Sequence, residues 1–154
     1  HIHVVSCDDY YYNHNLQDGD DKESFIRFRK SMGSSELTLK AKQDGNVVRT
    51  EINIDVTGNN DISVESFLKL GGYTKLFSIF KEAWIWRLDN CDVSFYTLAD
   101  GRSVVEIEAT SYSNEKEGVS IISSWEKNNL ADKIADGSLI KESRSLFEIF
   151  EDES

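Results

Sequence analysis

Apolar and polar residues alternate with a period of two through several short segments of the first two-thirds of the chain. The clearest segments are Ser24–Lys30, Glu36–Lys42, Val47–Val56 and Ser103–Thr110. Successive side chains of a β-strand point to opposite faces, so this period predicts strands with one apolar and one charged face. The chain is therefore restricted to folds in which a sheet separates two different environments.

Turn residues separate these segments. Asp44-Gly45 and Asp100-Gly101 predict tight hairpins, because Asp-Gly tolerates the positive φ of the favoured turns. About seven strands are predicted, at residues 1–12, 24–30, 36–42, 47–56, 76–88, 93–98 and 103–111. Three helices are predicted: Ile62–Leu70, capped by Ser63 or Asp61 and stopped by Gly71-Gly72, and the amphipathic segments Glu117–Ala135 and Leu139–Phe150.

Successive antiparallel hairpins can close into a barrel, which removes exposed strand edges. The pattern therefore predicts an α+β fold, a β-barrel with helices packed outside, two of them C-terminal. The chain contains no proline and no Gly/Ser-rich linker, and its length suits one domain over residues 1–154.

The charged strand faces allow two interpretations that periodicity does not separate. They are either solvated while the apolar faces form the core, or they line a barrel interior while the apolar faces pack outward. Arg27, Arg29, Lys40 and Arg49 lie on three neighbouring strands, and such cations suit phosphate oxygens. Glu106-x-Glu108 places two carboxylates on one face, a spacing that can hold a hard divalent cation.

The formal net charge of -11 disfavours a sequence-independent nucleic-acid binder, which needs a basic surface, and no such binding is expected. Basic residues nevertheless gather early in this acidic chain, which indicates a confined anion site. No apolar run approaches the roughly 20 residues of a membrane helix, so no membrane partner is expected. The two cysteines, Cys7 and Cys91, have no metal-type spacing, and we expect a cytoplasmic location.

The order of several short motifs resembles the CYTH, or triphosphate tunnel, family. The motifs are Asp9-Tyr10-Tyr11-Tyr12-Asn13, Arg27-Phe28-Arg29, Leu37-Thr38-Leu39-Lys40, Arg49-Thr50-Glu51, Lys81, Glu106-Ile107-Glu108 and the segment Ser143–Phe150. Each motif is short and unspecific alone, whereas their order and spacing run through essentially the whole chain.

The resemblance implies an antiparallel eight-stranded tunnel that takes triphosphate-bearing small molecules and depends on Mg²⁺ or Mn²⁺. Its relatives hydrolyse inorganic triphosphate, thiamine triphosphate or RNA 5′-triphosphate ends, or make cyclic AMP from ATP. Carried over, the phosphate-binding residues are Arg27, Arg29, Lys40, Arg49 and Lys81. Glu106 and Glu108 would hold the metal; Lys40 would also be catalytic, and Glu51 would bind metal or position a water or a basic neighbour.

Three departures from the family pattern bear on catalysis. No E-x-E-x-K strand precedes Asp9, Ala83 stands where the family has an arginine, and Tyr96 stands near the place of a usual aspartate. We expect a domain that lacks the family's N-terminal strand. The leading hypothesis is a metal-dependent triphosphate hydrolase. An adenylyl cyclase of the class IV type, a non-catalytic nucleotide or polyphosphate binder and a plain interaction domain are the alternatives, and a homodimer is left open.

Overall fold

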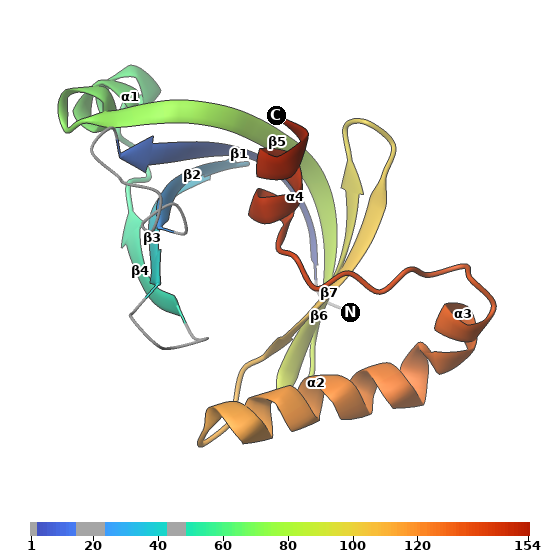
Figure 1. Cartoon of the computed structure of the whole chain (residues 1–154). Helices are drawn as coiled ribbons and strands as arrows, with labels where there is room; N and C mark the ends of the chain where they lie inside the picture. The colour runs from blue at the N-terminus through green and yellow to red at the C-terminus, as the bar shows by residue number, and fades with distance from the viewer. Residues whose placement is uncertain (1–2, 15–23, 43–48) are drawn as a thin grey trace. The chain divides into compact units, whose positions relative to one another are not determined.

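The computed structural model describes residues 3–14, 24–42 and 49–154, and these form seven strands and four helices (Figure 1). The strands are β1 (His3–His14), β2 (Phe25–Ser31), β3 (Ser34–Lys42), β4 (Arg49–Asp55), β5 (Tyr73–Arg87), β6 (Cys91–Leu98) and β7 (Ser103–Ala109). The helices are α1 (Asp61–Leu70), α2 (Glu115–Asn129), α3 (Ala131–Ala135) and α4 (Leu146–Glu153).

The strands form one sheet in the order β4-β3-β2-β1-β5-β6-β7. The pairings β1–β2, β2–β3, β3–β4 and β6–β7 are antiparallel, as their registers show. The predicted α+β class with an antiparallel sheet is confirmed. An eighth strand is not present in the described residues, and the predicted hairpin at Asp44-Gly45 lies outside them. Closure into a barrel and the placement of helices outside it stay predictions.

The chain divides into two compact units. The N-terminal unit contains Val5–Glu82 and Leu98–Asp100, and the C-terminal unit contains His1–Val4, Ala83–Thr97 and Gly101–Ser154. Strand β5 is continuous through the division, so the boundary falls inside a regular strand rather than in a linker.

Helix α1 packs against one face of the sheet in the N-terminal unit. Val64 and Leu68, four residues apart on one side of the helix, form a core with Tyr12 of β1 and Phe28 of β2. Tyr10, Ile26 and Leu37 extend this apolar face across three strands. The helix cap is Asn60, whose side chain accepts a hydrogen bond from the Ile62 backbone N–H, so the predicted caps Ser63 and Asp61 were wrong.

In the C-terminal unit the predicted hairpin is present, whereas the helices begin and end at other residues than predicted. Gly101 has a φ of 92°, as the predicted hairpin between β6 and β7 requires. The first predicted C-terminal helix is interrupted at Leu130, which separates α2 from α3. The second begins at Leu146 rather than Leu139, because the Ser145 side chain caps it by accepting from the Glu148 N–H. No helix in the described part of the chain is long and apolar enough to cross a membrane.

Candidate functional site

A buried carboxylate joins three strands of the N-terminal unit. Asp9 of β1 is 0% exposed, and it accepts hydrogen bonds from Arg29 of β2, at 2.7 Å from Nε and 2.8 Å from Nη2. Lys81 of β5 is 4% exposed, and its Nζ lies 3.1 Å from Oδ2 of Asp9. Asp9 and Arg29 are direct partners in the β1–β2 register, so strand pairing itself brings the carboxylate to the guanidinium.

The charges in this cluster support one another. Burial alone raises the pKa of Asp9, but the hydrogen bonds from Arg29 and the charges of Lys81, Arg29 and Arg27 outweigh it and lower the pKa to about 2. Burial lowers the pKa of Arg29, whereas its bond to Asp9 raises that pKa by more. Asp9 is therefore ionised at neutral pH, and it serves as a partner for two cations rather than as a proton donor.

A second polar cluster lies beside the first. Nη2 of Arg27 donates to Oγ1 of Thr38 at 3.3 Å and lies 3.8 Å from Oε1 of Glu36. The fully buried Thr38 hydroxyl has one proton, which it donates to Oδ1 of Asn53 at 2.7 Å or to Glu36 at 3.2 Å. Among the described residues, the buried Nε of Arg27 meets no hydrogen-bond acceptor. A buried donor without an acceptor costs about 1–3 kcal/mol, which an anionic ligand oxygen would relieve.

Burial separates the two interpretations of the charged faces. Asp9, Arg27, Thr38 and Lys81 are buried, so the centre of the polar face formed by β1, β2 and β3, together with Lys81 of β5, is shielded from solvent, whereas Arg29, Glu36 and Lys40 on this face are partly exposed. Its opposite face carries the apolar core with α1. On β4 the polar side chains of residues 51, 53 and 55 are exposed, as are Glu106 and Glu108 on β7, and there the faces are solvated.

Three aromatic rings lie on the same face as the cations. The ring of Tyr11 lies 5.6 Å from that of Phe25 and 5.2 Å from that of Phe77, measured between centroids. Tyr11 is also the direct register partner of Arg27. These tilted ring pairs connect β1 to β2 and to β5 on one face of the sheet. They give the arginine side chain a rigid, low-dielectric neighbour.

The remaining predicted site residues of this unit lie on β3 and on β4, which is the edge strand of the described sheet. Lys40 is half-buried and pairs in register with Phe25 on one side and Glu51 on the other. Arg49 begins β4, opposite Lys42, and its side chain lies outside the described residues. The structure thus brings Arg27, Arg29 and Lys81 into two adjoining buried clusters, whereas Glu51 is exposed.

The predicted metal ligands belong to the C-terminal unit. Glu106 and Glu108 are both exposed on β7, and in the register they lie opposite Ser94 and Asp92 of β6. Direct partners in an antiparallel pair share a face, so Asp92 adds a third carboxylate to it. In the part of the chain that the structure describes, no three such side chains converge on one point that could hold a metal ion.

Sequence reasoning missed several polar partners of the predicted cations. Arg29 binds Asp9. Arg27 contacts Glu36 and Thr38, and Thr38 in turn bonds to Asn53. On β6, Asp92 lies opposite Glu108. The motif around Asp9 and the alternation in β3 and β4 contained the signal. Only the register of the strands, however, shows which carboxylate meets which cation.

Comparison with known proteins identifies a matching family and several similar structures. The family model described as the CYTH domain matches residues 1–131. Two proteins of Pyrococcus horikoshii OT3 have similar structures: PH1012 (TM-score 0.68, 23% identity, covering 82% of this chain and 73% of that one) and PH1819 (TM-score 0.72, 19% identity, 98% and 86%). A candidate adenylate cyclase from Bacillus halodurans is also similar (TM-score 0.60, 9% identity, 96% and 82%). Among curated proteins, no significant match was found.

Proposed function

The chain belongs to the CYTH domain family, and from that premise we propose that it binds a triphosphate-bearing small molecule and hydrolyses it with the help of Mg²⁺ or Mn²⁺. The observation that supports this most is the cluster of cations at the centre of the polar face of the N-terminal unit. It holds two arginines and a lysine, and the Nε–H of Arg27 is buried without an acceptor among the described residues. Such a donor suits an oxygen of a bound anion.

The cations of this face are proposed to bind the phosphate oxygens. Arg27, Arg29, Lys81, Lys40 and Arg49 are the residues concerned. The planar guanidinium groups provide forked donors that match two oxygens of one phosphate, and the lysines provide compact charges. Phosphoryl transfer requires little covalent chemistry from the protein, so charge neutralisation and positioning would supply most of the rate.

The carboxylates are proposed to act on the metal and the water. Glu106 and Glu108 would hold the divalent ion, since carboxylate oxygens are the donors that Mg²⁺ and Mn²⁺ prefer, and Asp92 lies opposite Glu108 on the same face. A bound divalent ion would supply positive charge for phosphoryl transfer. Glu51 lies opposite Lys40 in the register, from where it would position a water or hold the lysine.

A turnover assay tests the proposal. The purified chain is given tripolyphosphate or ATP with Mg²⁺ or Mn²⁺, and both phosphate release and cyclic AMP are measured. The variant Glu106→Ala/Glu108→Ala should abolish turnover, whereas Glu115→Ala/Asp132→Ala, which removes two exposed helix carboxylates of the same unit, should not. We expect Arg27→Ala to lower affinity and turnover about tenfold or more, through the loss of charged hydrogen bonds. The exposed Arg87→Ala serves as its control.

Two outcomes would change the assignment. Cyclic AMP as the product would make the protein a cyclase. Tight binding without turnover would make it a binding protein, an alternative favoured by Ala83 in place of the family's arginine and by carboxylates that do not converge in the described residues. Equal activity of Arg27→Ala and the intact chain would rule out the mechanism.

A further inference from the structure

Asp9 is an unusual group to find in the middle of a site proposed for a polyanion. It is the one acidic side chain among the fully buried residues described, and both of its oxygens are engaged by cations. We propose that Asp9 is a built-in counter-anion that limits how strongly Arg29 and Lys81 attract a ligand, and that it positions both. This inference rests on the proposed function of the same face.

The geometry excludes the other roles that a site carboxylate commonly has. A general acid must carry a proton, but Asp9 lies between two cations that keep it ionised. A metal ligand must be within reach of the ion, but Asp9 is fully buried and two cations contact its oxygens, so a metal ion would be repelled. What remains for Asp9 is to orient its two partners and to balance their charge.

The orientation leaves donors available for a ligand. A guanidinium has five N–H groups in a fixed fork, and Asp9 takes two of them from Arg29. The Arg29 side chain is 27% exposed, so part of it extends beyond the buried carboxylate. Asp9 therefore fixes the inner edge of the guanidinium and thereby aims the outer edge.

The same carboxylate opposes the binding of a ligand. A phosphate held by the outer edge of Arg29 would lie across one guanidinium from Asp9, and both groups would be negative. Because Asp9 is fully buried, water and salt screen this repulsion less than they would between two exposed charges, and the repulsion grows with the charge of the ligand. A purely structural ion pair would have no such dependence on the ligand.

Removal of the charge of Asp9, with its shape kept, separates the two roles. Asp9→Asn keeps one acceptor for Arg29 but cancels the negative charge. We expect its affinity for tripolyphosphate, measured by calorimetry without metal, to rise about tenfold. Pyrophosphate should gain less and orthophosphate least. The matched control is Asp61→Asn, which removes one carboxylate from the Lys30–Asp61 pair of the same unit, on the side of the sheet that carries α1. We expect it to change affinity by less than about twofold.

Stability offers a second measurement if Asp9→Asn folds poorly. The loss of the counter-charge destabilises the free protein, but a bound tripolyphosphate replaces that charge, so the rise in melting temperature on binding should be larger in Asp9→Asn than in the intact chain. The double variant Asp9→Asn/Lys81→Met removes one charge of each sign, and it should recover stability and lose the gain in affinity.

The outcomes separate this inference from the proposed function. Should the intact chain fail to bind tripolyphosphate while Asp9→Asn binds it, the proposed function fails and the counter-anion role stands. Should the intact chain bind and Asp9→Asn bind no better, with equal effects for all three phosphates, Asp9 is only structural. Binding by neither protein, or failure of tripolyphosphate to rescue an unfolded Asp9→Asn, would overturn the inference as well.

Discussion

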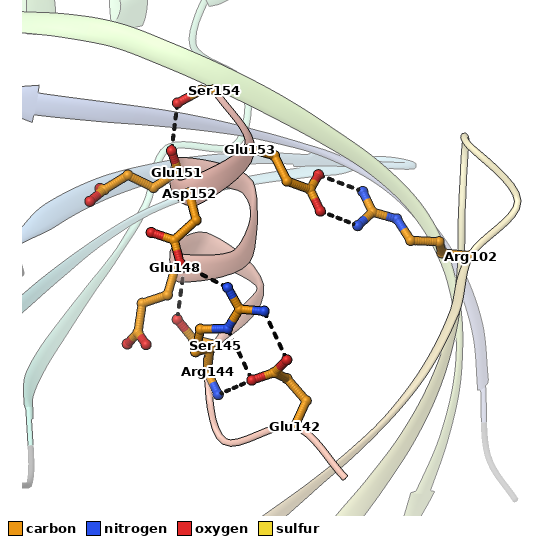
Figure 2. Close-up of polar contacts among 9 residues, drawn as sticks. All are labelled: Arg102, Glu142, Arg144, Ser145, Glu148, Glu151, Asp152, Glu153 and Ser154. Atoms are coloured by element: carbon orange, nitrogen blue, oxygen red, sulfur yellow. Dashed lines mark hydrogen bonds and ion pairs between the residues drawn. The ribbon is translucent and has the colours of Figure 1, made fainter. Parts of the chain in front are cut away.

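Two arginine–carboxylate pairs in this molecule are both bidentate, with similar bond lengths, and have very different surroundings. In the N-terminal unit, Arg29 donates to both oxygens of Asp9 at 2.7 and 2.8 Å, and the carboxylate is fully buried. In the C-terminal unit, Arg102 donates to both oxygens of Glu153 at 2.6 and 3.1 Å, with side chains 40% and 50% exposed (Figure 2). Bond lengths alone therefore do not reveal what an ion pair contributes, because the surroundings decide it.

The same contrast extends to the neighbouring groups. Asp9 has a second buried cation, Lys81, whereas the exposed pair is part of a surface network around α4. There Arg144 binds Glu142 and Asp152 (Figure 2). Arg102 also lies 4.8 Å from the ring centroid of Phe150. Water can replace the partners of the surface network, but it cannot reach the carboxylate of Asp9 itself.

The largest expected effect comes from breaking the buried pair outright. Asp9→Ala leaves Arg29 and Lys81 without their carboxylate, and breaking a buried pair in this way costs about 3–5 kcal/mol. Urea unfolding followed by circular dichroism measures the loss. The comparison variant is Glu153→Ala, for which we expect less than about 1 kcal/mol. Similar losses in the two variants would contradict the distinction drawn between the pairs.

The second largest expected effect is the loss of stability when acid protonates Asp9. The pKa of Asp9 is lowered from 3.8 to about 2 in the folded protein, so its contribution to stability is complete above about pH 4 and is lost as the pH falls through 2. The shift corresponds to about 2 kcal/mol. The difference in unfolding free energy between the intact chain and Asp9→Asn, followed from pH 5 to pH 2, should shrink by that amount. A constant difference would argue against an ionised Asp9 as the source.

The smallest expected effect is the salt dependence of the exposed pair. Arg102→Gln removes the bonds to Glu153 and the contact with Phe150, and we expect a loss of about 0.2–1 kcal/mol that disappears near 1 M salt. Hydrogen exchange of the α4 amides with and without salt is the measurement. The matched substitution Lys69→Gln, at an exposed position of α1, should show no such dependence. A loss that persists in high salt would mean that Arg102 acts through packing.

The sequence predicted the sheet well because alternation and turn residues are local. All seven strands lie within a few residues of where alternation, turn residues, or aromatic and β-branched content predicted them, and Gly101 takes the positive φ that its hairpin needs. The helices after β7 were less well predicted. Apolar residues recur with helical spacing on both sides of Leu130 and again from Leu139 onward. This spacing does not reveal that the helix ends at Leu130 or that Ser145 caps the last helix.

The site was predicted only in part, because local alternation does not show which strands meet. Alternation placed Arg27 and Arg29 on one face, and the structure confirms this. It gave no sign that Asp9 would be buried between Arg29 and Lys81, because those residues come from three strands that are distant in the sequence. The role of Glu106 and Glu108 in holding a metal stays a prediction.

The register of β2 has a consequence for how such a gene can change. Ile26 and Phe28 face α1 while Arg27 and Arg29 face the buried carboxylate and hydroxyl groups, so the loss or gain of one codon inside this strand would exchange the two sets. Apolar side chains would then meet Asp9 and Thr38, and guanidinium groups would meet Val64 and Leu68. Descendants of this gene can therefore vary β2 by point substitution, whereas insertions and deletions are confined to the segments between strands.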